Sequence, residues 1–545
     1  MQSKIAHFLH TDVVVVGSGA AGVRAAIEAR RHEVEVLIVS ASRIGHANNS
    51  AISHGGFSTS MCQTGDSPER LCEDTIKGGS GLNRPFLVRM LSYDISTEVA
   101  SLEKMGVVFR RIPDGSYAFE GRGGHSVARR LTTPHSSGME LLLPVLRIVK
   151  ESSIKTLGGV KAVFLLQRDG CACGILGINR RGEWICVSAK AVVLATGGGG
   201  ALYSKNTNVP WASGGGYALA YEAGLVLQDM EFVQFVLWHM KDPGVPSRIP
   251  PAEVFLLSGA DLLNGKGCSL MKDIGSLTRD SISQVVARAI EEEYSGSEGF
   301  VYLDLKNLRN NELYSIPNLR AERIRVFPAA HFFMGGVRVD ENLGTSIEGL
   351  YVAGETMGGV HGANRLGGNA LAEAFVFGRK AGFLAAMFAK KCSADRISVS
   401  YAVRALEKKA AAGLSGVSRR SISPDISKLI EDLKALVATH AGVLRNKSKL
   451  DSGLLAVETL RNTSSQLPSP KTEDLWDWFE LWHCLTVAEM IFRSSLERKE
   501  SRGAHYRDDY PYTDNEKWLV NVCTSKSNQG AMKLRRVPVS TGSSA

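Results

Sequence analysis

A glycine-rich segment followed by an apolar run holds the residues with the clearest capacity for chemistry. Four glycines between positions 359 and 368 let the backbone approach a ligand closely, because they carry no Cβ atom. Arg365 lies among them, and its planar guanidinium can clamp a carboxylate through two hydrogen bonds. Asn369 opens the run 370–377, whose apolar pattern predicts a helix. The amino end of such a helix stabilises negative charge on a planar cofactor. The segment predicts a carboxylate site beside a cofactor.

A second cofactor element stands near the start of the sequence. A short apolar run predicts a buried strand, and Gly17, Gly19 and Gly22 follow it with G-x-G-x-x-G spacing before a helical pattern. The first glycine permits a tight turn, the second lets a pyrophosphate approach, and the third packs the helix against the strand. The next predicted strand, 34–39, ends at Ser40 instead of the acid that usually binds a ribose. These elements predict a dinucleotide and leave both FAD and NAD open.

Further segments resemble a known family. Residues 191–200 resemble the strand and A-T-G-G turn of flavoproteins with two dinucleotide folds, and residues 349–355 resemble their G-L-Y-x-x-G-E segment. With the glycine-rich segment, they make the chain resemble the flavoprotein family of succinate dehydrogenase, fumarate reductase and L-aspartate oxidase, from Val13 to Pro511. The resemblance implies FAD as the cofactor, with Glu355 accepting a hydrogen bond from a ribose or ribityl hydroxyl.

The resemblance also implies how FAD is attached. Succinate dehydrogenases carry a histidine joined covalently to FAD, and that position falls on Asn49, which cannot make the bond. The FAD is therefore expected to be non-covalent, as in aspartate oxidases. The expected cofactor-binding residues are Gly17, Gly19, Ala20, Ala21, Gly22, Ser40, Asn49, Ser50, Gly55, Gly56, Ala195, Thr196, Gly197, Gly354, Glu355, Arg365, Asn369, Ala370 and Leu371.

Members of this family move a hydride between flavin N5 and one carbon of a C–C bond, and a proton to or from the adjacent carbon. The resemblance assigns three catalytic residues here. His331, in a P-x-A-H-x-x-M-G-G motif, and Arg365 would hold a substrate carboxylate, and Arg279 would transfer the proton. An arginine, whose pKa exceeds about 12, suits this task because a carbanion formed by hydride attack is far more basic. The alternative for Arg279 is a capping salt bridge with Asp280.

Two positions depart from the family's pattern. Residues 230–235 match the lead-in to a substrate-binding H-P-T, but Val236 replaces the histidine. A later T-E pair reads Ser258-Gly259, which offers no carboxylate for a proton relay to Arg279. Losing one charge-assisted hydrogen bond to a carboxylate costs about 1.5–3 kcal/mol, so neither succinate nor fumarate is assigned as the substrate. The residues that could rebuild a second subsite are His239, Asp261 and Lys266.

The predicted fold is α/β: a two-dinucleotide-fold (Rossmann-like) FAD domain with an inserted α+β capping domain and a C-terminal helical domain. Residues 8–225 and 346–395 are assigned to the FAD domain, which the capping domain, 226–345, interrupts. Residues 396–523 form the helical domain, and the polar segment 524–545 is expected to be a flexible tail.

One segment of the helical domain, Glu500-Ser-Arg-Gly-Ala-His505, resembles an E-S-R-G-A-H motif of the family. Its arginines, histidine and acids suit either a docking surface or an internal web of ion pairs, and we favour the web.

Composition narrows the class of protein, its cellular location and its possible partners. The 545 residues are 44% hydrophobic and 22% charged, as in soluble proteins of two or three domains. No apolar run reaches the roughly 18–20 residues that span a bilayer, and the first ten residues leave no room for a signal peptide. A cytoplasmic protein is expected, associated with a membrane only through partner subunits. The net charge of +9 is dispersed, which disfavours nucleic acid as a partner.

The nine cysteines lack the spacing of an iron–sulfur or zinc site, so no metal is expected in this chain. The leading hypothesis is an FAD-dependent oxidoreductase that acts on a C–C bond of a small carboxylate and exchanges electrons with an iron–sulfur partner subunit. The first alternative is oxidation of a C–N bond, as in L-aspartate oxidase. The second is a flavin electron-transfer subunit with a diverged substrate site, which the retention of Arg279, His331 and Arg365 disfavours.

Overall fold

The computed structural model describes most of the chain. The described residues are 5–61, 65–121, 123–246, 249–250, 252–274, 278–294, 299–308, 316, 318–393, 397–413, 425–465 and 470–539, without the side chains of residues 279, 409–413 and 465.

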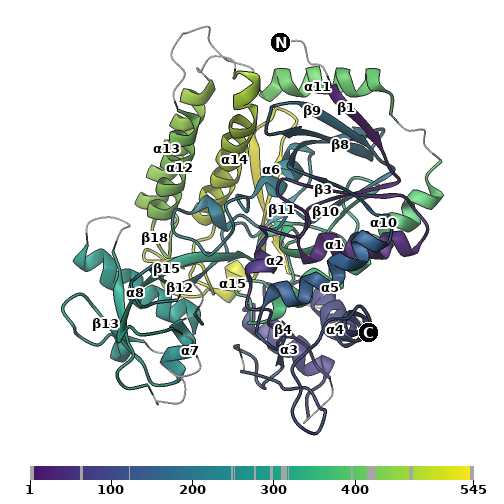
Figure 1. Ribbon diagram of the computed structural model, residues 1–545. Coiled ribbons are helices and arrows are strands. Elements are labelled where there is room, and N and C mark those ends of the chain that lie inside the picture. The colour runs from purple at the N-terminus through teal and green to yellow at the C-terminus, as the bar shows by residue number, and fades with distance from the viewer. Residues whose placement is uncertain are drawn as a thin grey trace.

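A five-stranded parallel sheet forms the centre of the FAD domain (Figure 1). Its strands, in spatial order, are β17 (Leu350–Val352), β10 (Ala191–Leu194), β2 (Val13–Val16), β3 (Val36–Ser40) and β6 (Lys155–Gly158). The valines of β2 are at most 5% exposed, because helices and a second sheet cover both faces, as parallel sheets require. The predicted strand, glycine turn and helix at the start of the chain are confirmed.

Helices α1 (Ala20–Arg31) and α10 (Asn369–Lys391) pack closely beside this sheet. A Cβ atom on Gly378 would lie 2.5 Å from the carbonyl oxygen of Ala21, and one on Gly382 would lie 2.1 Å from that of Ala25. Only glycine permits these backbone contacts. The predicted helix after the glycine-rich segment therefore exists, begins at Asn369, and packs along the helix of the dinucleotide motif.

The rest of the FAD domain surrounds this unit. A second sheet has the order β1 (Ile5–His10), β9 (Trp184–Ser188), β8 (Cys171–Asn179) and β7 (Val160–Arg168). The other elements are α2 (Asn49–Ile52), the pair β4 (Phe57–Ser58) and β5 (Arg130–Leu131), α3 (Pro68–Gly78), α4 (Pro85–Lys104), α5 (Gly138–Glu151), α6 (Gly215–Glu222), and the 3-10 turns η1 (Gly200–Leu202) and η3 (Gly354–Thr356).

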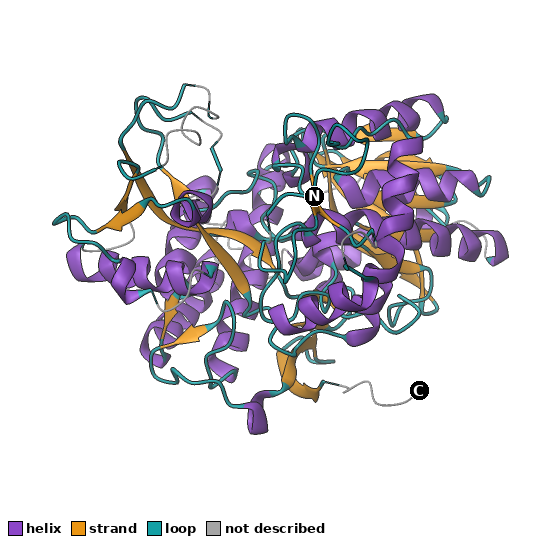
Figure 2. Ribbon diagram, turned by 90° about the horizontal axis from the view of Figure 1, so that it is seen from below, coloured by secondary structure: helices purple, strands orange, loops and turns teal. Residues whose placement is uncertain are grey.

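The inserted segment forms a separate lobe, seen at the lower left of Figure 1 and apart from the FAD sheets in Figure 2. Its antiparallel sheet has the order β12 (Val233–His239), β15 (Arg323–Phe333), β14 (Val301–Asp304) and β13 (Asp261–Leu263). Its helices are α7 (Ala252–Leu257), α8 (Arg279–Glu293) and the turn η2 (Met271–Asp273). The lobe has its own hydrophobic core, as expected of a capping domain.

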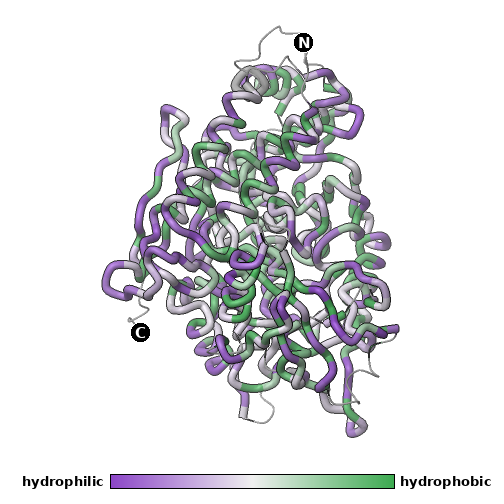
Figure 3. The backbone as a smooth tube through the Cα atoms, turned by 90° about the vertical axis from the view of Figure 1, so that its left-hand side faces the viewer, coloured by the Kyte–Doolittle hydropathy of each residue, from purple (hydrophilic) through white to green (hydrophobic). Residues whose placement is uncertain are grey.

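The C-terminal region begins as helices. These are α11 (Val399–Gly413), α12 (Ile426–His440), α13 (Lys447–Ser465), the turn η4 (Thr472–Asp474), α14 (Leu475–Glu497) and α15 (Asn515–Trp518), with the short strand pair β18 (Leu444–Arg445) and β19 (Tyr506–Arg507). Figure 3 shows hydrophobic segments through the middle of the molecule and hydrophilic segments along its outside. Within the described residues, no helix is long and apolar enough to cross a membrane.

The expectation of a flexible tail from residue 524 is wrong for most of that segment. Strand β20 (Val520–Lys526) pairs with β21 (Met532–Pro538), and β20 also pairs with β11 (Leu227–Gln228). Strand β11 in turn pairs with β16 (Gly336–Val337), so this sheet joins the C-terminal strands to both ends of the inserted segment. Backbone hydrogen bonds order the segment, although it carries few large apolar residues. Residues 540–545 lie outside the described residues.

Candidate active site

The turn after β2 is built for close backbone contact. Gly17 has a φ of 119°, and a Cβ atom there would lie 2.0 Å from the carbonyl oxygen of Ala195, at the end of β10. A Cβ atom on Gly22 would lie 2.1 Å from the carbonyl oxygen of Gly17. Both glycines are required by the fold itself, and they bring the amino end of α1 to the carboxyl ends of β2 and β10. This edge of a parallel sheet is where such folds bind dinucleotides.

Polar groups gather at this edge. The first turn of α1 has no side-chain cap, and its Ala20 amide donates to the Ser50 hydroxyl at 3.1 Å. The hydroxyls of Ser18 and Ser40 are 3.0 Å apart. Gly197 has a φ of 79°, and a Cβ atom there would meet nothing within 4 Å. Uncapped amides, hydroxyls and open space fit the phosphates and riboses of a dinucleotide such as FAD.

Asn49 supports the opposite side of this region. Its amide group hydrogen-bonds the Asn208 side chain, and its Oδ1 accepts from the Val209 amide at 3.0 Å. Gly55 and Gly56 pack against Ser137 and Arg130. Asn49 thus fixes the 208–209 loop through bonds that a histidine ring could not reproduce in the same way.

Glu355 follows β17 and reaches the strand that carries His331. Its Oε1 accepts the Phe333 amide at 3.0 Å, and its carbonyl accepts the Tyr217 hydroxyl at 2.7 Å. Burial raises the pKa of Glu355 to about 8, although Phe333 and Arg365 act in the opposite direction. A protonated carboxyl at this place can donate as well as accept, which enlarges the hydrogen-bonding role expected from the sequence.

The glycines near Arg365 are needed for packing within the protein itself, in addition to any contact with a ligand. A Cβ atom on Gly362 would lie 2.4 Å from the Gly79 carbonyl oxygen, and one on Gly368 would lie 2.1 Å from the Ser58 hydroxyl. Gly367 faces Gly123 in the same way. The sequence pattern predicted a close approach to a ligand, whereas these contacts show that the glycines are also needed for the turn to fit against neighbouring segments.

The predicted helix start adds three cofactor candidates. Asn369 is buried and donates from Nδ2 to the Thr75 hydroxyl at 3.2 Å, while its Oδ1 is buried without a partner among the described residues. Ala370 and Leu371 follow in the first turn of α10, which has no side-chain cap. Thr196 bonds the Thr356 hydroxyl at 3.1 Å. The buried Oδ1 and the uncapped turn fit a polar ligand at this end of α10.

Arg365 is held by a set of contacts that the sequence did not single out. Its Nη2 donates to Gln234 Oε1 at 2.8 Å, and its Nη1 donates to the Leu366 carbonyl at 3.1 Å. Gln234 in turn donates to the carbonyl of Arg365 at 2.9 Å. The guanidinium carbon lies 4.6 Å from the centre of the Phe332 ring. Arg365 is 5% exposed, so the guanidinium is fixed in a buried position.

His331 is the extra residue of a β-bulge. The register of β12 and β15 passes from Gln234 opposite Phe332 to Phe235 opposite Ala330, so the pairing skips position 331. Bulges re-aim side chains and are common beside active sites. Thr207 bonds His331 Nδ1 at 2.8 Å and orients the ring. The bulge places His331 next to Phe332, whose ring lies under the Arg365 guanidinium, and no pattern in the sequence indicated this bulge.

Arg279 is the first residue of α8, but its side chain lies outside the described residues. The position that was expected to hold a relay acid is Gly259, which has none. Instead Glu253, on α7, is a buried carboxylate at 8% exposure. Helices α7 and α8 both pack against β12. Glu253 was not singled out from the sequence, because an acid within a short apolar helix has no distinctive pattern.

None of the three suggested replacements for the second subsite lies beside Val236. His239 is on the opposite face of β12 and bonds the Met240 carbonyl through Nδ1 at 3.1 Å. Asp261 is on β13, the strand farthest from β12 in the sheet, and accepts the Ser269 hydroxyl at 2.7 Å. Lys266 is exposed in the following loop. The strand order and the side-chain contacts therefore give no support to the suggestion that these residues rebuild the subsite.

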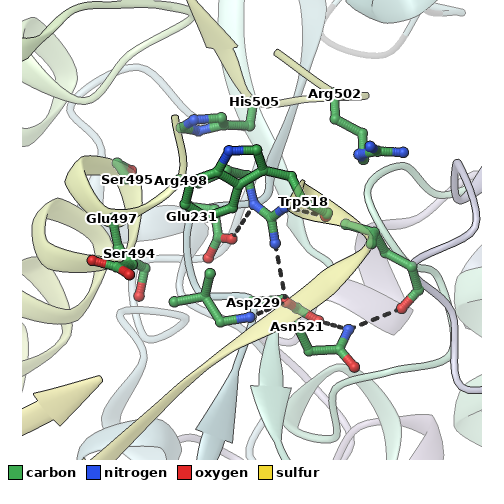
Figure 4. Close-up of polar contacts among 12 residues, drawn as sticks. Asp229, Glu231, Ser494, Ser495, Glu497, Arg498, Arg502, His505, Trp518 and Asn521 are labelled. Carbon is green, nitrogen blue, oxygen red and sulfur yellow. Dashed lines mark hydrogen bonds and ion pairs between the residues drawn. The ribbon is translucent and has the colours of Figure 1, made fainter. Parts of the chain in front are cut away.

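The E-S-R-G-A-H segment lies inside the molecule. Arg498 bonds Glu231 at 2.7 Å (Figure 4). It also bonds Glu500 at 2.9 Å, and all three side chains have 0% exposure. Glu500 also bonds Arg502, and Asp229 lies 3.8 Å from Arg498. Burial, together with the neighbouring Glu231, raises the pKa of Asp229. Buried side chains cannot form a docking surface, so the interpretation as an internal web is confirmed.

Comparisons with known proteins agree with this geometry. The FAD binding domain family matches residues 12–371, and the fumarate reductase flavoprotein C-terminal family matches residues 430–544. A fumarate reductase (CoM/CoB) subunit from Methanothermobacter marburgensis is 34% identical over 94% of this chain and 97% of its own length. The fumarate reductase flavoprotein subunit of Mycobacterium tuberculosis is 31% identical over 97% of each chain.

Among solved structures, a variant of FrdA from E. coli quinol fumarate reductase has a TM-score of 0.88 at 27% identity, covering 99% of this chain and 98% of that chain. The chain therefore belongs to the flavoprotein family of fumarate reductase and succinate dehydrogenase, and it is an FAD-dependent oxidoreductase of the type that acts on CH–CH groups.

Proposed function

We propose that this chain is a catalytic flavoprotein that transfers a hydride between FAD and a carbon–carbon bond next to a carboxylate. The observation that carries this proposal is the immobilised guanidinium of Arg365, held by Gln234, a backbone carbonyl and the Phe332 ring. A side chain locked by packing and hydrogen bonds is what a substrate anchor requires. The bound FAD supplies or accepts the hydride, that is, two electrons and one hydrogen nucleus.

Each protein group then has one task. Arg365 and His331 bind the carboxylate and orient the substrate, and Arg279 gives or takes the proton at the neighbouring carbon. We further propose that Glu253 exchanges this proton with Arg279. Its buried carboxylate and the packing of α7 and α8 on one strand support that role, because a buried acid is stabilised by a nearby cation.

An iron–sulfur subunit is the proposed electron partner. Two relatives are named as subunits of fumarate reductases, one of them as the flavoprotein subunit, which supports action within a complex. We propose that the chain acts in the cytoplasm and meets a membrane only through such partners. Oxidation of a C–N bond is less favoured, because an anchored carboxylate beside a proton donor suits reduction or formation of a C–C double bond.

The first experiment compares two variants at different positions along α8. Arg279→Gln is expected to abolish turnover of the reduced protein with unsaturated carboxylates while FAD remains bound. Arg288→Gln is the control, because Arg288 is half-exposed and bonds Tyr506 and Asp508 on the protein surface. Turnover is measured as anaerobic reoxidation of the flavin. Unchanged turnover in Arg279→Gln would remove the proton-transfer role.

The same preparation tests how FAD is attached. It also tests the two alternative functions, which are oxidation of a C–N bond and electron transfer without a working substrate site. Acid precipitation is expected to release the flavin into the supernatant, because Asn49 cannot form the covalent bond. Flavin that stays in the pellet contradicts non-covalent binding. Peroxide release with an amino acid would favour C–N oxidation, and absence of any flavin response to small carboxylates would favour an electron-transfer role.

A further inference from the structure

The strand pair β12–β15 contacts Arg365 with one of its faces, and the side-chain types on this face change from one cross-strand pair to the next. Gln234 and Phe332 are cross-strand partners, and both contact Arg365. Side chains two residues apart on a strand share a face, so the next pair on this face is Val236 with its partner Ala329. An amide and an aromatic ring that contact the guanidinium are thus followed on this face by two small aliphatic side chains.

The side chains of this apolar pair are buried without joining a hydrophobic core. Val236 is 1% exposed and Ala329 is 0% exposed. The opposite face of β12 packs into the cores of the FAD domain and the capping domain, through Val233, Phe235 and Leu237. Within the described part of the chain, Val236 and Ala329 belong to neither of these cores. Their face of the strand is the one turned toward Arg365.

The spacing of the two pairs matches the length of a small acid. Residues two apart on a strand are separated by about 6.5–7 Å, which is comparable with the distance between the ends of a four-carbon dicarboxylate. A substrate whose carboxylate is held by Arg365 would therefore place its other end against Val236 and Ala329. A carboxylate desolvated there without a partner costs several kcal/mol. An uncharged apolar group suits this end of the site.

Besides Arg365, Lys205 is a cation that contacts a side chain of this face. Its ammonium lies 4.8 Å from the centre of the Phe327 ring and donates to the Gly299 carbonyl at 3.1 Å. Phe327 is the partner of Trp238, one pair beyond Val236 on the same face. Lys205 therefore lies farther along the strands than the end of a four-carbon acid, and its ammonium already has a protein acceptor.

We propose that the substrate is an α,β-unsaturated monocarboxylate with an uncharged apolar group on its β-carbon, and that Val236 determines this specificity. The proposal rests on the proposed function, in which Arg365 and His331 hold the single carboxylate. In the reductive direction, one alkene carbon gains a hydride, with both electrons from the reduced cofactor, and the other gains a proton from the protein. The double bond becomes a single bond and no leaving group departs.

The test uses the full-length FAD-bound protein, reduced with dithionite under anaerobic conditions. Flavin reoxidation by trans-2-butenoate and by fumarate is compared, and kcat/KM is expected to be roughly ten- to a hundred-fold higher for trans-2-butenoate, from the cost of about 1.5–3 kcal/mol for one missing charged contact. Calorimetric titration of the oxidised protein with butanoate and succinate measures the same preference as binding, independently of turnover. Butanoate is expected to bind more tightly.

Two variants of one residue sharpen the test. Val236→His restores a polar donor and is expected to shift kcat/KM toward fumarate by roughly ten-fold or more. Val236→Ile, which keeps the apolar character, is the matched control and is expected to retain the native preference. If the histidine variant does not fold, Val236→Thr, which is close in shape to valine, is expected to show a smaller shift in the same direction.

The outcomes separate the two proposals. A native preference for fumarate and succinate overturns the monocarboxylate proposal and leaves the proposed function intact. A loss of that preference in Lys205→Met would then identify Lys205 as the second anchor, which also contradicts the proposal. Failure of all four acids to bind or to reoxidise the flavin overturns the carboxylate site and the proposal together.

Discussion

Two buried arginines, whose partners lie three residues apart in the chain, are held in different ways. Arg365 meets Gln234 in β12, and Arg498 meets Glu231 just before that strand. Each guanidinium lies over a phenylalanine ring, at 4.6 Å for Arg365 and 4.9 Å for Arg498. The described partners of Arg365 are a neutral amide, a carbonyl and the ring. Arg498 bonds two carboxylates and lies near a third.

The difference fits a structural role for Arg498 and the anchoring role that we propose for Arg365. Carboxylates around Arg498 balance its charge within the protein, so its interactions are complete before any ligand arrives. The described hydrogen-bond acceptors of Arg365 are an amide oxygen and a carbonyl oxygen, which orient the guanidinium without carrying a formal charge. Partner chemistry, more than burial, therefore distinguishes the two roles. This contrast leads to three predictions, which differ in the size of the expected effect.

The largest effect is expected from Arg498→Met. Removing the cation leaves Glu231 and Glu500 buried without their main partner, so the free energy of unfolding should fall by about 3–5 kcal/mol. Urea unfolding followed by circular dichroism measures this loss. Arg288→Met is the control, because an exposed ion pair contributes only about 0–1 kcal/mol. Similar losses in both variants would contradict the structural role of the web.

A smaller effect is expected from Gln234→Leu, which removes the amide that orients Arg365. The guanidinium loses one described acceptor and gains freedom, so kcat/KM for the carboxylate substrate should fall about ten- to a hundred-fold, corresponding to about 1.5–3 kcal/mol. The loss should appear mainly as a higher KM, with FAD content and the flavin spectrum unchanged. A lower kcat at constant KM would argue that Gln234 does not act through substrate binding.

Taken over a single pH unit, the smallest effect concerns Glu355, the carboxyl whose pKa is raised by burial and lowered by Arg365. Its pKa stands at about 8 in the folded protein, against an ordinary value of 4.5. A raised carboxyl pKa contributes stability that is complete below the unfolded value and is lost as pH rises through the folded value. The apoprotein should therefore lose stability between about pH 5 and pH 8, by up to about 1.4 kcal/mol per pH unit.

Glu355→Gln should flatten this dependence, because glutamine does not titrate. Thermal unfolding of the native and variant apoproteins at several pH values measures the difference. Parallel pH profiles would mean that Glu355 does not titrate in this range, and the site would then carry a negative charge beside Arg365 at neutral pH.

Parts of the site were predictable because they depend on local backbone requirements. Gly17 and Gly22 belong to one strand–turn–helix unit, so spacing reveals them. Asn369 marks the start of α10 for the same reason. Gln234 and Glu253 could not be selected, because a glutamine in a strand or an acid in a helix has no distinctive pattern. Their roles depend on neighbours more than a hundred residues away for Gln234 and on packing around the capping sheet for Glu253.

The C-terminal segment is a second case in which local sequence was not enough, because there an ordered strand was expected to be flexible. Its polar composition predicted flexibility, yet β21 is ordered by pairing with β20, which itself pairs with a strand almost three hundred residues earlier. Backbone hydrogen bonds of this kind are independent of side-chain polarity.

Residue types at fixed short spacings were enough to predict the dinucleotide turn and the helix that follows Arg365, and the resemblance of several segments to known motifs indicated the family and the cofactor. Three other features became visible only in the folded chain: which buried arginine is surrounded by acids, where the bulge turns His331, and which pair of side chains follows the clamp on its strand. These features depend on contacts between distant segments, which residue spacing along the chain does not encode.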